Sequence, residues 1–288
     1  METENSLRRR IKTVGELHAI VRTMKALAAV SVRQYEALLK SLDEYTQTVE
    51  MGMHVALRGR VFHQPDRKQP ASQLAAVIFG SDVGLCGRFN EDLIAYALDK
   101  MNGFQVTQAN RSVLAVGSRI DARLSELGHP VEETIITPGS ATAVISTVRQ
   151  ILAKIDEWQD RAIEQVLLFY RQSDSPRLLH LLPVDLRQFS RLSQKPWPSR
   201  IRPCFSLDAE RLLAALIRQH LFVCLFRACS ESLTAENQMR LRAMQAAEKH
   251  VQDKLDELLF QFRNQRQNTI DAEILDIGAG FEAVSNQS

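Results

Sequence analysis

Residues 208–278 read DAERLLAALIRQHLFVCLFRACSESLTAENQMRLRAMQAAEKHVQDKLDELLFQFRNQRQNTIDAEILDIG, a run without proline and without glycine before its last position. Inside a helix a proline costs about 3 kcal/mol and a glycine about 1 kcal/mol, so this run permits one very long helix. The sequence predicts such a helix from about Asp208 to Val284. At a rise of about 1.5 Å per residue it would be on the order of 115 Å long.

The first 58 residues also lack proline, and Gly15 and Gly52 are their only weak points. Steps of three and four residues, averaging about 3.5 as in a coiled coil, separate the apolar or small residues Leu7, Ile11, Val14, Leu17, Val21, Met24, Ala28, Val32, Tyr35, Leu38, Leu42, Tyr45, Val49 and Met53. The same spacing returns near the C-terminus at Val251, Leu255, Leu258 and Phe262 and, after a polar stutter at 263–267, at Ile270, Ile274, Ile277 and Phe281. Two long helices around a compact middle are expected to pair antiparallel, with one end projecting.

The middle of the chain has a different pattern and holds all nine prolines, from Pro65 to Pro203. Short apolar runs at 74–79, 112–116, 165–170 and 178–182 alternate with helical stretches at 90–100, 119–127 and 141–158. This alternation predicts a Rossmann-like α/β domain with a mostly parallel sheet. The fold class is therefore α/β, with an N-terminal coiled-coil helix (1–60), an α/β foot domain (61–205) and a long C-terminal coiled-coil helix (206–288).

Composition excludes several classes of protein. The chain has 36 basic and 34 acidic residues, so no strong basic face suggests nucleic acid. No apolar run approaches the roughly 18 residues that cross a bilayer, and the N-terminus lacks the apolar region of a secretory signal. The four cysteines, Cys86, Cys204, Cys224 and Cys229, form no CxxC pair and are expected to be free thiols in a reducing compartment.

One loop resembles a nucleotide site. Phe79–Gly87, FGSDVGLCG, follows a predicted strand and precedes a predicted helix, where a glycine-rich loop can cradle a phosphate. Its spacing fits neither GxxxxGK[ST] nor GxGxxG, and Asp82 would repel a phosphate, so a structural tight turn is favoured over a nucleotide site. Elsewhere the histidines are scattered, and Glu132 and Glu133 are interpreted as a solvated strand edge. The sequence predicts no catalytic residue, cofactor or metal.

A family resemblance spans the whole chain in order. The stretch Ser81–Asn90, SDVGLCGRFN, resembles the S-D-R-G-L-C-G-G-[LF]-N signature of F-type ATP synthase gamma subunits. The matching positions of this signature turn are Ser81, Asp82, Gly84, Leu85, Cys86, Gly87 and Asn90. Both terminal helices are similar to those of the family, whereas the part beyond residue 100 matches in layout more than in letters. Val83, Arg88 and Lys25 depart from the family pattern and indicate a divergent subgroup, for which the alternate, sodium-type bacterial enzymes are one candidate.

The resemblance implies a rotary central shaft. In the family the coiled coil lies inside a hexamer of alternating alpha and beta subunits, in a 3:3:1 assembly, and the foot domain rests on the membrane c-ring with the epsilon subunit. Rotation would couple ion flow through the ring to ATP synthesis or hydrolysis at beta, so this chain would be a non-catalytic subunit without a cofactor. It would be a peripheral protein of the cytoplasmic face of the bacterial inner membrane, without direct membrane insertion. The ring subunits set the coupling ion, proton or sodium.

The resemblance also implies contact residues. Five residues match positions that contact beta subunits: Met24, Lys25, Arg240, Arg266 and Gln267. Ile274, Ile277 and Phe281 would form an apolar bearing at the C-terminal tip. The alternatives are a solvated polar face at 266–267, an exposed lysine at 25, and a frayed helix end at Gly278 and Gly280. At the level of function, the alternatives are a nucleotide-using enzyme with coiled-coil arms and a static coiled-coil scaffold.

Overall fold

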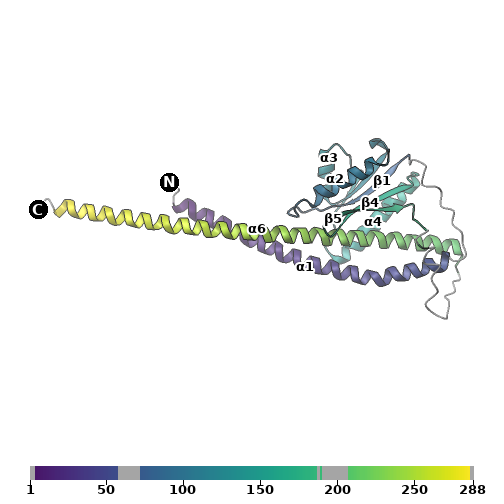
Figure 1. Cartoon of the computed structure of the whole chain (residues 1–288), viewed down its shortest axis with the longest axis horizontal. Helices are drawn as coiled ribbons and strands as arrows, with labels where there is room; N and C mark the ends of the chain where they lie inside the picture. Colours follow the sequence, from purple (N-terminus) through teal and green to yellow (C-terminus); the bar gives the residue numbers. More distant parts are fainter. Residues whose placement is uncertain (1–3, 58–71, 187–188, 190–206, 286–288) are drawn as a thin grey trace. The chain divides into compact units, whose positions relative to one another are not determined.

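A computed structural model describes residues 4–57, 72–186, 189 and 207–285 (Figure 1). The terminal segments form the two long helices that proline exclusion predicts, α1 (Glu4–Leu57) and α6 (Ala209–Ser285). The chain divides into two compact units: unit 1 comprises Met1–Ala28 with Leu241–Ser288, and unit 2 comprises Ala29–Arg240. Each unit thus contains part of α1 and part of α6. The boundaries predicted from the sequence, at residues 60 and 205, instead place each long helix in a segment of its own. The division at those residues stays a prediction.

The sheet of unit 2 has five strands in the order β3-β2-β1-β4-β5. β1 (Leu74–Phe79), β2 (Arg111–Val116), β3 (Glu133–Ile135) and β4 (Gln165–Gln172) are parallel, while β5 (Ser175–Leu182) pairs antiparallel with β4. The mostly parallel sheet is thereby confirmed, and four of its strands overlap the predicted apolar runs. β3 was not predicted because this edge strand has only three residues and no apolar run.

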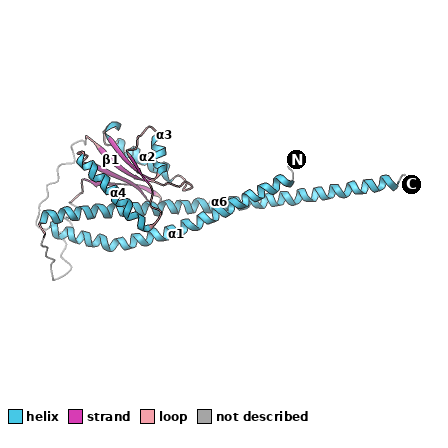
Figure 2. Ribbon diagram, turned by 180° about the vertical axis from the view of Figure 1, so that it is seen from behind, coloured by secondary structure: helices cyan, strands magenta, loops and turns pink. Residues whose placement is uncertain are grey.

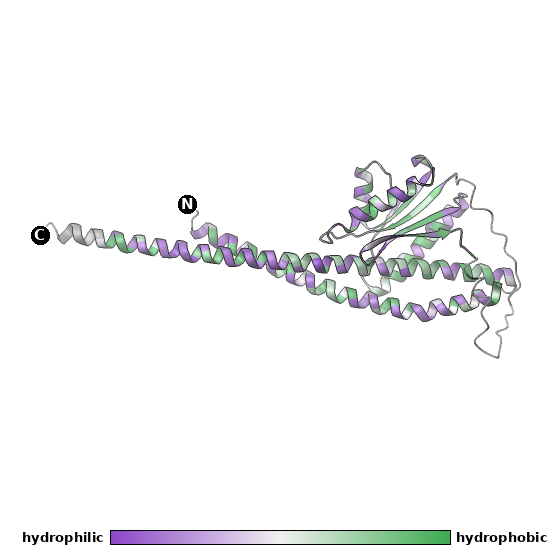
Figure 3. Cartoon of the chain, viewed as in Figure 1, coloured by the Kyte–Doolittle hydropathy of each residue, from purple (hydrophilic) through white to green (hydrophobic). Residues whose placement is uncertain are grey.

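Alternate residues of β1 pack on opposite faces of the sheet, as the pleat of a strand requires. Leu74, Ala76 and Ile78 join a core cluster with α2 (Phe89–Asn102) and α3 (Ser118–Glu126). Ala75, Val77 and Phe79 join a second cluster with α4 (Ala141–Asp160) and with the unit 2 parts of α1 and α6. The sheet is therefore a buried layer between helices, visible in Figure 2. Its strands carry the most continuous apolar colour in Figure 3.

Within each unit α1 and α6 pair antiparallel, as predicted. In unit 2 Gln238 bonds to Glu36 and Gln219 bonds to Tyr45, so partner numbers fall along α6 as they rise along α1. In unit 1 the guanidinium of Arg8 lies 5.5 Å from the ring centre of Phe262, and Lys25 pairs with Glu248.

Most buried positions of α1 lie multiples of seven residues apart: Leu7, Val21, Ala28, Tyr35, Leu42, Val49 and Ala56. Met53 and Leu57, near the end of the helix, are also buried. The predicted contact face of α1 included too many residues, however, because Leu17 and Tyr45 are exposed. The full alternation of three and four does not hold, since only one position in each heptad is consistently buried.

In the part of the chain that the structure describes, one helix meets the length and composition of a membrane span. An 18-residue window within Glu210–Gly278 of α6 has a mean hydropathy of 1.6, which qualifies the expectation drawn from uninterrupted apolar runs. A core helix of a soluble protein meets the same criterion, so this one window is weak evidence for a span. Leu221, Leu225 and Phe226 of α6 indeed pack in the core cluster beside the sheet.

Three of the four cysteines lie in the described residues and are free thiols, as expected: Cys86, Cys224 and Cys229. Burial raises the pKa of all three, to about 11 for Cys224, so their thiolate forms are disfavoured. Cys204 lies outside the described residues.

Candidate functional site

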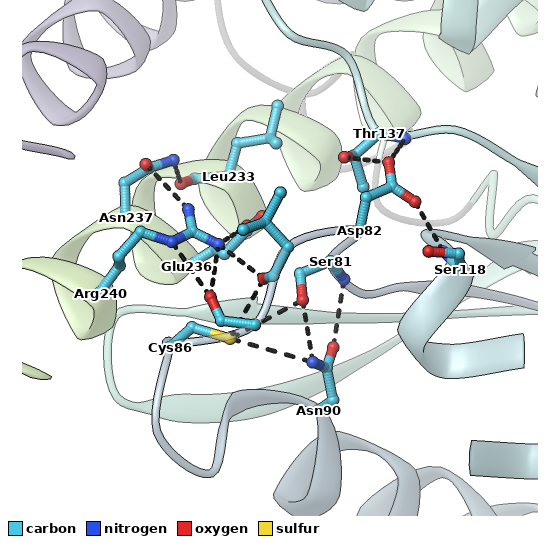
Figure 4. A network of polar contacts seen from close by, with 12 residues as sticks. Ser81, Asp82, Cys86, Asn90, Ser118, Thr137, Leu233, Glu236, Asn237 and Arg240 are labelled. Carbon is cyan, nitrogen blue, oxygen red and sulfur yellow. Dashed lines mark hydrogen bonds and ion pairs between the residues drawn. The ribbon is translucent and has the colours of Figure 1, made fainter. Parts of the chain in front are cut away.

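The signature turn begins where β1 ends and leads into α2 (Figure 4). Asn90, in the first turn of α2, is buried and holds the start of the turn from inside. Its amide oxygen accepts from the backbone N–H of Ser81 (3.1 Å), and its Nδ2 donates to the Ser81 hydroxyl (2.9 Å). The Cys86 Sγ lies 3.9 Å from the same Nδ2. One buried amide therefore satisfies polar groups at both ends of the turn.

Asp82 caps a different helix. α3 begins after Gly117, which has no side chain to accept from the first N–H groups. Asp82 supplies the acceptor instead, since its carboxylate accepts from the Ser118 N–H (2.7 Å) and from the N–H and hydroxyl of Thr137 (both 2.6 Å). Burial tends to raise the pKa of Asp82, but the hydrogen bonds from Thr137 and Ser118 outweigh it and lower the pKa.

Two glycines allow the turn to approach the sheet edge. A Cβ atom at Gly80 would lie 1.9 Å from Cγ1 of Ile120, and one at Gly117 would lie 2.7 Å from the Ser81 nitrogen. Gly117 also has a φ of +110°, a region that residues with a side chain rarely adopt. Gly80 and Gly117 thus provide close packing, not room for a ligand.

The outer side of the turn is bound to α6. Arg240 donates from Nη2 to the carbonyl oxygen of Val83 (2.8 Å) and more weakly to that of Gly84 (3.4 Å). The same Nη2 pairs with Glu236 Oε1 (2.6 Å), and Nη1 donates to Asn237 Oδ1 (3.2 Å). Arg240, Glu236 and Asn237 are all buried. Burial raises the pKa of Glu236 to about 7, although its bond with Arg240 acts in the opposite direction.

This geometry argues against a nucleotide site in the turn. The N-terminus of α3, where a phosphate would find free N–H groups, is already occupied by the Asp82 carboxylate. Arg240, a buried cation beside the turn, is engaged by Glu236 and by backbone carbonyls. Within the described residues no group of three or more His, Cys, Asp or Glu side chains could hold a metal ion.

The predicted contact residues lie in different surroundings. Met24 is half-buried, and Lys25 is bound to Glu248 of the same unit, so the alternative of a freely exposed lysine is wrong. Arg240 is bound within the chain, and we propose a structural role for it in place of a contact with beta. Arg266 and Gln267 are exposed, and the described residues give neither side chain a hydrogen bond or ion pair.

The C-terminal end of α6 lacks cover. Every described side chain from 266 to 278 is exposed, including Ile274 at 61% and Ile277 at 73%. Ile270 and Leu275 are exposed apolar residues of the same segment. The helix continues through Gly278 and Gly280 to Ser285, so these glycines do not end it. The side chain of Phe281, the third predicted bearing residue, lies outside the described residues.

A second exposed apolar face lies on α1, and Met24 is the one residue of this face that the sequence predicts as a contact. Leu17, Ile20 and Leu27 are exposed, and the half-buried Met24 lies between them. These four residues, the α1 stripe, follow steps of three, four and three, which place them on one side of a helix. The signal was present in the sequence, but Leu17 and Met24 were assigned to the seam with α6.

Glu132 lies beside the exposed edge strand β3, as the sequence interpretation expects, but its side chain is not simply solvated. Its carboxylate accepts from Trp158 Nε1 (3.3 Å) and pairs with Lys154 (3.2 Å) and Arg161 (2.6 Å). Burial alone would raise the pKa of Glu132, but hydrogen bonds from Ser112 and these three partners lower it to about 2. Such a network shows how a perturbed carboxylate can be structural rather than catalytic.

Comparisons with solved structures agree with the fold. A chain of the Euglena gracilis mitochondrial ATP synthase (OSCP/F1/c-ring, rotational state 3) has a TM-score of 0.69 at 14% identity, and the match covers 98% of this chain and 94% of that one. A chain of the Tetrahymena thermophila mitochondrial ATP synthase central stalk and c-ring has a TM-score of 0.55 at 17% identity, over 79% and 99%. At these identities the likeness concerns the fold.

Comparisons with known sequences cover nearly the whole chain. The ATP synthase gamma chain of Desulforamulus reducens is 24% identical over 291 residues, which cover 99% of this chain and 100% of the relative. That of Cupriavidus pinatubonensis is 21% identical with the same coverage. The family model described as ATP synthase matches residues 3–284. That match spans nearly the whole chain, and the two long helices and the α/β domain agree with it. This chain therefore belongs to the ATP synthase family.

Proposed function

We propose that this chain is the gamma subunit of an F-type ATP synthase, the rotating central shaft that couples ion flow through a c-ring to ATP synthesis or hydrolysis. The observation that carries the proposal is the uncovered end of α6. Arg8 of α1 meets Phe262, and beyond residue 265 every described side chain of α6 is exposed although several are isoleucines. An exposed apolar surface on a long helix indicates a protein partner.

The proposed partners surround and support the shaft. Alpha and beta subunits would enclose the coiled coil in a 3:3:1 assembly, while the epsilon subunit and the c-ring would hold the foot domain. Full-length relatives named ATP synthase gamma chain and the c-ring assemblies of the structural relatives support this arrangement. The chain would be a non-catalytic peripheral protein on the cytoplasmic face of a bacterial inner membrane, with ATP chemistry confined to beta.

Two surfaces are proposed to contact the hexamer. At the α6 end, Arg266 and Gln267 would bond to beta loops, since a guanidinium matches a carboxylate with paired N–H donors. Ile274, Ile277 and Phe281 would lie in an apolar sleeve, where directional bonds that hinder turning are few. On α1, Met24 and its exposed neighbours in the α1 stripe would contact a helix of a beta subunit. Lys25 would approach an acidic loop of a beta subunit.

Co-expression with alpha and beta subunits from the same organism tests the proposal. The chain is expected to co-purify in a 3:3:1 complex that hydrolyses ATP. Replacing both Arg266 and Gln267 by alanine should lower turnover several-fold while the isolated chain keeps its stability, because neither side chain has a partner in the described residues. Arg263→Ala, an exposed arginine one turn earlier, is the matched control and should leave turnover unchanged.

The alternatives predict different results. A static scaffold would give a complex whose ATPase is indifferent to the Arg266 and Gln267 changes. A nucleotide-using enzyme would bind ATP as an isolated chain, which equilibrium dialysis with radiolabelled ATP would detect. Failure of the chain to co-purify with alpha and beta would refute the proposal itself.

A further inference from the structure

The signature turn and α6 are joined by several buried contacts, all within unit 2. Ser232 of α6 donates to the carbonyl oxygen of Phe79, the last residue of β1 (3.2 Å). One turn further along α6, Ala235 packs with Cys86 and Phe89 in a small apolar cluster. Five residues beyond Ala235, Arg240 binds the carbonyls of Val83 and Gly84. The contacts therefore follow one side of α6 from residue 232 to 240.

The buried charges of this joint are poorly explained by stability alone. Glu236 and Arg240 form a buried ion pair, and such a pair contributes little net stability because both charges lose their hydration. A pair of apolar side chains of similar volume would stabilise the fold as well. The guanidinium does supply something that apolar contact lacks, since its planar donors fix the direction of the bonds to two successive carbonyls. The guanidinium therefore fixes the position of α6 relative to the signature turn.

The joint lies where α6 leaves unit 2. Arg240 is the last residue of that unit, and α6 continues into unit 1 at Leu241. The only other covalent link between the units is in α1, between Ala28 and Ala29. These two helices connect the units covalently, so they can carry torque from the foot domain to unit 1. The signature turn is thus attached to one of the two helices immediately before the exit.

We propose that the signature turn is a clamp through which the foot domain drives α6, with Arg240 and Glu236 as its positioning residues. The inference rests on the proposed function, because only a rotor has torque to transmit. Up to Leu233, α6 is packed in the core cluster beside the sheet, so a loosened clamp would let only its last turns in unit 2 twist against the foot domain. ATP hydrolysis in the hexamer would then turn α6 without turning the foot domain fully, so fewer ions would cross the membrane for each ATP.

The test uses the holoenzyme reconstituted into vesicles, with the ratio of ions pumped to ATP hydrolysed as the readout. Pumping is followed both as proton and as sodium uptake. Because Arg240→Ala would leave Glu236 as an unpaired buried charge, the informative variant replaces both residues, Glu236→Gln with Arg240→Met. This variant carries no buried charge and no donor for Val83 and Gly84. We expect its coupling ratio to fall severalfold, because the variant lacks the guanidinium donors that hold the carbonyls of Val83 and Gly84.

Arg218→Ala is the matched control. Arg218 also joins α6 to the foot domain, through Asp156 of α4 (2.8 Å), but both side chains are exposed and such pairs are weak. Its coupling ratio should equal that of the unaltered holoenzyme. Arg240→Lys should recover part of the ratio, because an ammonium can donate to a carbonyl but lacks the planar fork.

The outcomes separate the two proposals. Normal coupling in an assembled complex of the double variant, or an equal fall in Arg218→Ala, would overturn the clamp and leave the proposed function intact. Failure of the unaltered chain to assemble with alpha and beta would overturn the proposed function and the clamp with it.

Discussion

Glu132 illustrates at the scale of single residues how a perturbed acid can serve the fold. Its pKa in the folded chain is about 2, below the ordinary value of 4.5, so the folded state favours the ionised form. The resulting stabilisation is fully present above about pH 4.5 and is lost as the pH falls toward 2. The pKa shift alone would correspond to about 3 kcal/mol, but Glu132 is partly exposed and solvent screens its ion pairs, so we expect Glu132→Gln to lower the free energy of unfolding at pH 7 by no more than about 2 kcal/mol.

Urea denaturation followed by the fluorescence of the buried Trp158 measures this effect. Glu133→Gln is the control, because Glu133 also pairs with Lys154 but is half exposed, and it should cost less than about 1 kcal/mol. The difference between Glu132→Gln and the unaltered chain should shrink below about pH 4.5. A difference that is constant from pH 7 to pH 3 would refute the ion-network explanation.

Substitution of three glycines distinguishes two reasons why a position requires glycine, a positive φ and a lack of room for a Cβ atom. Gly117→Ala combines a positive φ with a clash against the Ser81 backbone and should cost at least about 2 kcal/mol. Gly128→Ala has a φ of +76° without a neighbour within 4 Å and should cost about 1 kcal/mol. Gly139→Ala has neither feature and should be neutral within about 0.5 kcal/mol. Thermal unfolding measures the order, and equal effects at Gly117 and Gly128 would exclude the clash.

At the scale of elements, α1 has two faces that the sequence did not distinguish. Val21 is 8% exposed and Ile20 is 56% exposed, although both are β-branched neighbours. Val21→Ala should destabilise the isolated chain by about 1–2 kcal/mol, because it removes buried methyl groups from the contact with α6. Ile20→Ala should leave unfolding nearly unchanged, as circular dichroism during thermal unfolding would show.

The assembled complex should reverse this order if the α1 stripe contacts a partner. Ile20→Ala would then weaken co-purification with alpha and beta more than Val21→Ala does. Equal behaviour of the two variants in both measurements would contradict the assignment of separate faces to α1.

The sequence predicted the elements well wherever one physical effect dominated. Exclusion of proline predicted α1 and α6, and the apolar runs predicted β1 and β4 to within a few residues. It failed for β3, a three-residue edge strand without an apolar run. It also failed at Leu17, because spacing shows that residues share a face but not whether that face is covered.

The candidate site could be predicted only in part, since its contacts join distant residues. The glycines and Asp82 of the signature turn were evident from the sequence as a structural turn. Nothing local indicated that Arg240 would bind the carbonyl of Val83, a residue 157 positions away. The same holds for Asp82, which caps a helix that begins 36 positions later.

At the scale of the whole molecule, the chain combines two units that share two continuous helices. Unit 2 contains the sheet and the signature turn, and unit 1 contains the uncovered end of α6. Such a division suits a part that is held at one region and acts on partners at another. An asymmetric shaft would contact three similar beta subunits differently, and differential contact is what shifts a conformational equilibrium.

Direct observation of rotation tests the central claim most directly. The complex with alpha and beta would be fixed to a surface through beta, and a bead would be attached to the foot domain at a cysteine introduced at the exposed Ile136. The account predicts that the bead turns in one direction while ATP is hydrolysed and stops when ATP is removed. A complex that contains this chain and hydrolyses ATP while the bead stays still would contradict it.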